Sequence, residues 1–348
     1  MRLFFIIFLF TTINFAKISD KEIANMFILG FYGSGQNICS DLQKGLGGVI
    51  VFQKSPINRK KIKNFSSANS LKELTTNIKI CGDKPLIAVD QEGGLVQRVK
   101  LSKKYPKASV VSQKGEFYAR YIYNKMAKEL NSLGINFNLA PVADLAINPK
   151  NVVINRFGRS YSKDAKSVIK YDSIFIDSMH RFNVATSLKH FPGHGSSLGD
   201  THKGFVDVTN LWKKVELEPY YALKNKTDTV MVAHIYNKKL DSIYPASLSK
   251  RIVQKILRDK IGFNKVVISD DLQMGAIAKH YSLKQRVKLS INAGVDIMLF
   301  ANQVHPKRVI KLDRLIKIVR ELLDNGEISP NSIKRANLRI NKLKQRLY

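Results

Sequence analysis

Eight short runs of apolar, mostly β-branched residues recur along the chain, separated by loops and helix-length segments. They are Met26–Phe31, Val49–Phe52, Leu86–Val89, Phe137–Val142, Ala185–Leu188, Val230–Ala233, Val266–Ile268 and Ile297–Phe300. Strands that are apolar along their whole length are typical of parallel sheets whose two faces are both covered. Eight alternations favour a single (β/α)8 TIM barrel, with room for irregular strands, over an open doubly wound sheet.

Helical spacing of apolar residues fits the segments between these runs. Lys114–Leu133 has this spacing and is followed by Gly134, a common helix stop. A second helix is expected to end at Gly262. Val309–Leu323 and Ser332–Leu347 are amphipathic, and we expect them to be C-terminal helices that close the barrel.

The composition narrows the class of protein. Of 348 residues, 44% are hydrophobic and 24% are charged, which excludes a wholly disordered chain. The formal net charge of +31 is compatible with nucleic acid or with an anionic polymer such as a cell wall. The basic residues of the C-terminal tail, however, lie on predicted helices with apolar stripes, so we interpret them as solvated surface rather than a nucleic-acid site.

The first 16 residues have the pattern of a cleaved signal peptide. Arg2 precedes an apolar run, Leu3–Phe10, and Ala16 stands before Lys17. The run of eight is far shorter than the roughly 20 residues of a spanning helix. We therefore expect residues 17–348 to be one mature domain, periplasmic or secreted, without a stable membrane anchor. A cytoplasmic protein with an uncleaved first segment is the alternative.

Only two cysteines are present, Cys39 and Cys81, which excludes a disulfide scaffold and a four-cysteine metal site. Two buried thiols are the expectation. A disulfide between them is the alternative for an exported protein.

Chargeable residues follow at least five of the eight runs. They are Asp90, Asp144, Lys189 with His190, His234, and Asp270 with Asp271. In a TIM barrel the carboxyl ends of the strands form the rim on which the chemistry takes place. The sequence therefore predicts an active site at this rim.

Two of these segments could together cleave a glycosidic bond. The glycine-rich loop after Lys189 and His190 contains Asp200 and His202, and an Asp two residues from a His can orient its ring for proton transfer. Asp270 is the first carboxylate after a strand, where a nucleophile or electrostatic partner is needed. Asp271, which leaves the strand in the opposite direction, is expected to support the loop.

A third segment, Asp90–Arg98, contains paired glycines between an acid and a base. Asp90 and Arg98 are able to hold sugar hydroxyls or a carboxylate. An Asp–Arg salt bridge that only stabilises the loop is equally compatible with this pattern.

Four segments occur in the order found in family 3 glycoside hydrolases: Asp90–Arg98, Lys189–His202, Met231–Ile235 and Ile268–Met274. From about Ile23 to Asn302, the chain resembles this family, and within it the bacterial β-N-acetylhexosaminidases (β-N-acetylglucosaminidases) of peptidoglycan recycling. The family fold is a TIM barrel, which agrees with the strand pattern. The resemblance implies a retaining exo-acting enzyme that releases terminal β-linked N-acetylglucosamine and needs no cofactor or metal.

The resemblance also implies roles for single residues. Asp270 would be the nucleophile, His202 the general acid/base and Asp200 its partner. The substrate-binding residues would be Asp90, Arg98, Lys189, His190 and Arg159, the last in Arg159-Ser160-Tyr161-Ser162.

This sequence departs from the family pattern in three places. Leu95 stands where the family usually has an arginine, which removes one charge near the pocket, and residues 153–158 are one or two longer than usual. The loop before Asp200 reads Ser196-Ser197-Leu198-Gly199 but keeps its length. The expected activity class does not change, whereas the subsite preference can.

Three alternatives remain open from the sequence. A metal-dependent TIM-barrel hydrolase would use ligands drawn from His190, His194, His202, His234 and Asp270. A non-catalytic barrel would bind peptidoglycan through its basic surface. Phosphorolysis could replace hydrolysis, because a histidine acid/base repels phosphate less than a carboxylate does. We expect a monomer that acts on a carbohydrate substrate.

Overall fold

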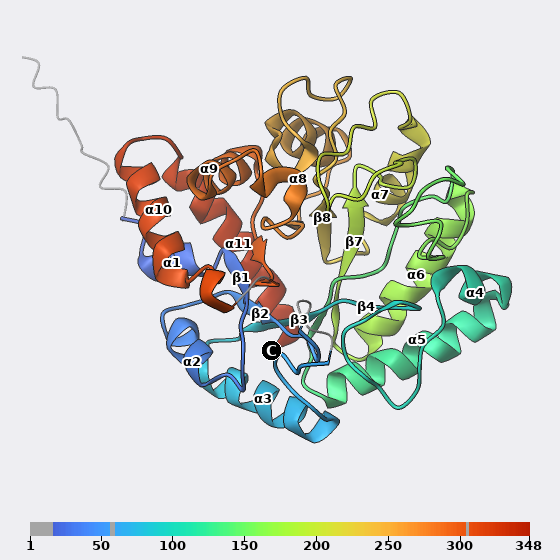
Figure 1. Cartoon of the computed structure of the whole chain (residues 1–348), viewed down its shortest axis with the longest axis horizontal. Helices are drawn as coiled ribbons and strands as arrows, with labels where there is room; N and C mark the ends of the chain where they lie inside the picture. The colour runs from blue at the N-terminus through green and yellow to red at the C-terminus, as the bar shows by residue number, and fades with distance from the viewer. Residues whose placement is uncertain (1–16, 56–59, 304–305) are drawn as a thin grey trace, which may run out of the picture.

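The eight predicted runs form one parallel sheet that curls into a nearly closed barrel, with helices in an outer ring around it (Figure 1). The computed structural model describes residues 17–55, 60–303 and 306–348, so the predicted leader lies outside the described residues. The strands are β1 (Phe27–Gly30), β2 (Gly48–Ile50), β3 (Leu86–Val89), β6 (Phe137–Asn138), β7 (Ala185–Phe191), β8 (Thr229–Val232), β9 (Val266–Ser269) and β10 (Met298–Phe300). The prediction of a (β/α)8 barrel is confirmed.

The strand order in the sheet follows the chain, except that β10 returns to pair with β1. Leu29 of β1 is therefore opposite Phe300 on one side and Val49 on the other. Between β9 and β10 the pairing is reduced to an isolated parallel bridge that joins Ile268 to Ile297. This pair is the seam of the barrel.

The helices lie between consecutive strands and at both ends of the described chain. They are α1 (Asp20–Ala24), α2 (Gln36–Gln43), α3 (Ala68–Cys81), α4 (Ala108–Gln113), α5 (Gly115–Ser132), α6 (Ala165–Arg181), α7 (Glu218–Leu223), α8 (Gly275–Ala278), α9 (Leu283–Ala293), α10 (Leu312–Asp324) and α11 (Pro330–Leu347). Short helical segments are η1 (Lys214–Leu217), η2 (Ala246–Leu248), η3 (Arg251–Lys260, a π-helix) and η4 (Pro306–Arg308), and β4 (Gln91–Gly93) pairs with β5 (Val96–Gln97) as a hairpin. Within the described residues, none of these helices has the length and apolar character that crossing a membrane requires.

Two strands differ in length from the apolar runs that predicted them. β6 ends at Asn138, because Ala140 turns back to donate to the Asn138 carbonyl and Pro141 has no N–H for a ladder. β7 instead continues past Leu188 to Phe191 and is buried along its whole length. Its extension contains Lys189 and His190, two residue types that an apolar pattern cannot predict inside a strand.

The C-terminal helices close the barrel as expected. α11 packs against the N-terminal segment, where the amide of Asn25 donates to Asn337 at 2.7 Å and Lys344 donates to Asn25 at 2.7 Å. The last residue, Tyr348, donates its hydroxyl to the Pro85 carbonyl just before β3. The two ends of the domain are thereby fastened to each other beneath the strands.

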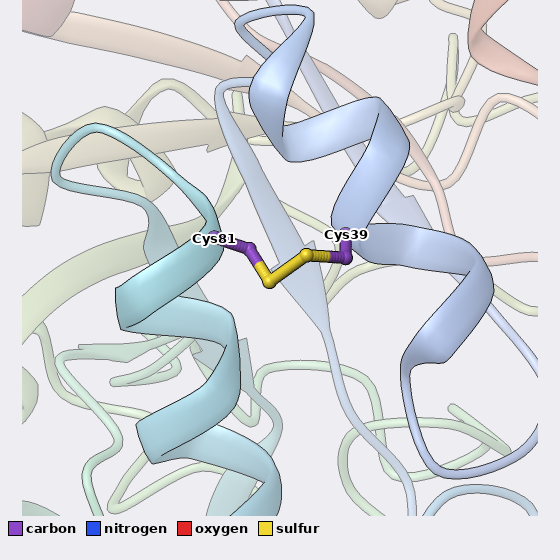
Figure 2. Close-up of a disulfide and its surroundings, with 2 residues drawn as sticks. All are labelled: Cys39 and Cys81. Carbon is purple, nitrogen blue, oxygen red and sulfur yellow. A yellow bond between two sulfur atoms is a disulfide. The ribbon is translucent and has the colours of Figure 1, made fainter.

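Cys39 and Cys81 form a disulfide between α2 and α3 (Figure 2). Their Cα atoms are 5.2 Å apart, within the usual range for a bridge, and the two residues are 42 apart in sequence. The expectation of two buried thiols is therefore wrong. The sequence could not predict the disulfide, because the pairing of the two cysteines depends on how two neighbouring outer helices pack.

Reduction of this disulfide should destabilise the domain. Opening a loop of 42 residues removes a constraint on the unfolded chain that is worth about 4 kcal/mol in the chain-entropy model. We expect a reducing agent to lower the urea midpoint of the wild type but not that of a C39S/C81S double variant, which starts at the lower value. An unchanged wild-type midpoint under reduction would contradict the bridge.

Candidate functional site

The polar residues that follow the strands gather at the carboxyl ends of β3, β6, β7, β8 and β9, as predicted for the rim. Lys189 is at the centre of one group: its ammonium is 2.9 Å from Asp90 and 2.7 Å from Glu92. Arg159 donates two hydrogen bonds to the same Glu92 carboxylate, from Nε at 2.8 Å and from a terminal guanidinium nitrogen at 2.7 Å. Two bases and two acids thus form one largely buried network.

The charges of this network stabilise one another. Burial by itself would raise the pKa of Glu92, but Arg159 and Lys189 outweigh it and hold that pKa well below its usual range. Burial would likewise lower the pKa of Lys189, and the carboxylates of Asp90 and Glu92 raise it instead. The bidentate Arg159–Glu92 pair also fixes the planes of both groups. The site therefore has a rigid network of paired charged side chains on this side.

His190 is oriented from below by Asp144. The Nδ1 atom of His190 is 2.6 Å from one carboxylate oxygen, and the other oxygen accepts the backbone N–H groups of His190 and His194. Burial would raise the pKa of Asp144, but the neighbouring His190 lowers it. The Nε2 atom of His190 is 3.4 Å from Arg159, so this ring links Asp144 to the Lys189 network.

The two aspartates after β9 have different environments. Burial would raise the pKa of Asp270, but His234, His190 and His202 lower it to about 2, so its carboxylate stays ionised at neutral pH. Burial raises the pKa of Asp271 to about 6. One oxygen of Asp271 accepts from the backbone N–H groups of Gln273 and Ala301, at 3.0 and 3.2 Å. This arrangement agrees with a loop-supporting role for Asp271.

Asp200 and His202 form a pair on the loop above the rim. The Nδ1 atom of His202 is 2.8 Å from Asp200, which also accepts the backbone N–H of His202 at 3.0 Å. Burial would raise the pKa of Asp200, and the hydrogen bonds from His202 lower it. The His202 side chain is 68% exposed and is close enough to Asp270 to lower its pKa. Its Nε2 edge is thus available for proton transfer.

Arg98 is not the partner of Asp90. The two are joined through the backbone, where the N–H of Arg98 donates to the Asp90 carbonyl at 3.1 Å, while the Asp90 side chain pairs with Lys189. The Asp90–Arg98 salt bridge is therefore absent from the described residues. The Nε of Arg98 is buried and has no hydrogen-bond partner within the described part of the chain. Leu95, in the turn of the same hairpin, is 70% exposed.

Three residues that position the site were given no role in the glycosidase interpretation of the sequence. Glu92 stands inside the Asp90–Arg98 motif and Asp144 follows a strand, so both gave a signal. His234 was noted at its strand end and as a candidate ligand in the metal-dependent alternative. It is buried with Nδ1 2.7 Å from the Ser247 hydroxyl and Nε2 2.9 Å from the Asp271 carbonyl, and burial lowers its pKa. A neutral ring that donates through Nε2 and accepts at Nδ1 satisfies both contacts and holds the end of β9 in place.

Glu216, in η1, had no sequence signal at all. It is buried beneath the loop that leads to Asp200, and its carboxylate accepts the backbone N–H groups of Gly195 at 3.1 Å and Ser196 at 3.3 Å. Its other oxygen accepts the N–H of Lys213 at 3.2 Å. Burial without a cationic partner raises the pKa of Glu216 to about 7. This side chain therefore anchors the base of the catalytic-loop candidate.

The residues named for a zinc site do not assemble as one. Within the described residues, no group of three or more His, Cys, Asp or Glu side chains is arranged to hold a metal ion. Both ring nitrogens of His234 have protein partners, and the Nδ1 atoms of His190 and His194 face Asp144 and Ser197.

The anchor at Glu216 should make stability depend on pH. Its folded-state pKa of about 7 lies above its ordinary value of 4.5, so the folded protein binds the proton more tightly, and stability is lost as pH rises through this window. E216Q stays neutral throughout. Between about pH 5 and pH 8 the unfolding free energy of the wild type should fall relative to that of E216Q, by up to about 3 kcal/mol. Glu73→Gln removes one exposed carboxylate and is the control. If unfolding free energy plotted against pH ran parallel for E216Q and the wild type, the raised pKa of Glu216 would be contradicted.

Comparisons with known proteins agree with this geometry. The chain is 35% identical over 267 residues to a beta-hexosaminidase of Tolumonas auensis, a match that covers 74% of this chain and 76% of that protein. It is 31% identical over 332 residues to beta-hexosaminidase A of Pseudoalteromonas piscicida, covering 87% of this chain but only 54% of that protein.

The fold also matches solved structures. A glycoside hydrolase family 3 β-N-acetylglucosaminidase from Paenibacillus sp. str. FPU-7 superimposes with a TM-score of 0.85 at 26% identity, covering 95% of this chain and 63% of that one. Residues 21–343 match the family described as the glycosyl hydrolase family 3 N-terminal domain. The resemblance inferred from the motifs is confirmed, and with it the class of glycoside hydrolase: the chain belongs to glycosyl hydrolase family 3.

Proposed function

We propose that this protein is a retaining exo-β-N-acetylhexosaminidase that removes terminal β-linked N-acetylglucosamine from glycans, peptidoglycan fragments in particular. The observation that carries the proposal is an ionised Asp270 on the barrel floor below a partly exposed His202–Asp200 pair. A retaining glycosidase needs a carboxylate on one side of the sugar and a proton donor on the other. The names of the beta-hexosaminidase relatives and of the similar β-N-acetylglucosaminidase structure support the choice of sugar.

In the first step Asp270 attacks the anomeric carbon while His202 gives its proton to the departing oxygen, so the aglycone leaves as a neutral alcohol. In the second step His202 takes a proton from water, and the water oxygen displaces Asp270 from the sugar. Asp200 accepts the Nδ1 proton of His202, which leaves Nε2 to exchange the reacting proton. The stereochemistry is retained because two displacements occur at the same carbon.

The remaining residues of the site are suited to hold the sugar. Lys189 and Asp90 form an ion pair at the carboxyl ends of β7 and β3, and the Nε of Arg98, which has no partner among the described residues, is a donor that a sugar hydroxyl can satisfy. Arg159 acts on the sugar through other residues, because its guanidinium is hydrogen-bonded to Glu92 and contacts His190. We assign binding to Asp90, Arg98, Lys189 and His190, and positioning of these groups to Arg159.

We also propose that the enzyme is exported. The Cys39–Cys81 disulfide supports this, because disulfides persist in oxidising compartments and are rare in the cytosol. The signal-peptide pattern of residues 1–16 is a second, independent support. A net charge of +31 would favour residence near an anionic cell wall.

The nucleophile assignment predicts a ranking of variants. On a chromogenic β-N-acetylglucosaminide, D200A should lose activity within the about 10²–10⁴-fold range of acid/base catalysis, and D270A should fall below D200A. Asp177→Ala, at an exposed α6 position paired with Lys226, is the matched control and should hydrolyse as the wild type does. The matching β-glucoside should be a poor substrate.

Near-normal hydrolysis by D270A would remove Asp270 from the mechanism. Product analysis by NMR should show the β-anomer first. The same assay in phosphate buffer distinguishes the alternative chemistry, because phosphorolysis would yield the sugar 1-phosphate in place of the free sugar.

Export predicts a processed N-terminus. The full chain expressed in a bacterial host should be recovered outside the cytoplasm with Lys17 as its first residue, by N-terminal sequencing. Phe5→Asp, which interrupts the apolar run, should keep the chain in the cytoplasm with Met1 or Arg2 first. Recovery of an unprocessed wild type in the cytoplasm would overturn the proposal.

A further inference from the structure

An exposed aromatic cluster borders the catalytic-loop candidate and has no role in the steps above. Phe205, three residues after His202, is 52% exposed. Its ring centroid lies 5.2 Å from that of Tyr236 and 6.2 Å from that of His280. We call these three side chains the rim platform.

Backbone contacts hold the rim platform on the catalytic face. The backbone of Tyr236 pairs with the loop segment that follows Phe205. Its N–H donates to the Val206 carbonyl and its carbonyl accepts the N–H of Val208, both at 2.9 Å. On the other side, the N–H of Ala276 in α8 donates to the Thr201 carbonyl at 3.1 Å. The loop is thus bound to the segments that follow β8 and β9, and β9 ends next to Asp270.

The position of the proton donor determines what the rim platform faces. In the proposed mechanism His202 gives its proton to the oxygen of the departing group, so the aglycone must lie on the side of His202. Phe205 is on the same loop, three residues after His202, and its aromatic ring is exposed to solvent. A pyranose ring presents a face of C–H bonds, whose partial positive charge favours the negatively polarised face of an aromatic ring.

We propose that the rim platform binds the first sugar of the aglycone, a pyranose ring that stacks on Phe205, with Tyr236 and His280 supporting that ring from its edges. The inference rests on the proposed glycosidase function and adds a substrate class to it. The enzyme would prefer glycan aglycones over leaving groups without a ring.

Two substrates with the same N-acetylglucosaminyl group separate aglycone binding from chemistry. N,N′-Diacetylchitobiose has a sugar as its aglycone, whereas the leaving group of N-acetyl-β-D-glucosaminyl fluoride is a single fluoride ion. We expect F205A to lower the ratio of kcat/KM for the disaccharide to kcat/KM for the fluoride about fivefold, the size of one lost aromatic contact. F205W should restore the ratio, because it restores the aromatic face.

Phe117→Ala is the matched control, since Phe117 is 89% exposed on α5 and far in sequence from the loop. It should leave both kcat/KM values as they are. An equal loss on both substrates in F205A would mean that Phe205 only shapes the loop, and an unchanged ratio would mean that it binds nothing; either result overturns the inference. Hydrolysis of neither substrate by the wild type would instead refute the proposed function itself.

Discussion

Buried charge has to be matched by opposite charge, and the site depends on this constraint more than on any other. Lys189 lies inside β7 with its side chain 3% exposed, which is tolerable only because Asp90 and Glu92 meet its ammonium. Glu92 in turn requires Arg159. One lysine thereby fixes the hairpin after β3 and the long loop after β6 against β7. Glu92 is shared by Lys189 and Arg159, so its removal would leave the largely buried guanidinium of Arg159 without its carboxylate.

The site combines this rigid floor with a loop that is held at a few points. Asp270 directly follows the buried strand β9, whose end is held by His234 through the Asp271 carbonyl, and His190 lies in β7 and is oriented by Asp144. His202 is exposed, and its loop is fastened at the base by Glu216 and further along by pairing with Tyr236. Under the proposed mechanism, a fixed carboxylate and an accessible proton donor suit a reaction in which the leaving group and water must exchange places above the sugar.

The sequence predicted what depends on local pattern and missed what depends on distant neighbours. Apolar runs located all eight strands, and strand-end polar residues located the rim. The pattern could not extend β7 through Lys189, because the acids that make its burial possible come from another part of the chain. The sequence did not identify Glu216, because it accepts hydrogen bonds from backbone N–H groups, and these groups leave no pattern of side chains in the sequence. The disulfide likewise required the packing of α2 on α3.

The adjacent aspartates after β9 show how one strand end serves both chemistry and closure of the barrel. Between β9 and β10 only one isolated bridge was found in the described chain, so side chains have to replace part of the ladder. The hydroxyl of Ser269 accepts the N–H of Leu299 at 3.0 Å, and Asp271 accepts that of Ala301 at 3.2 Å. Asp271 is thus occupied in joining the seam. In the proposed mechanism, this leaves the neighbouring Asp270 to act on the substrate, so the two adjacent acids have separate tasks.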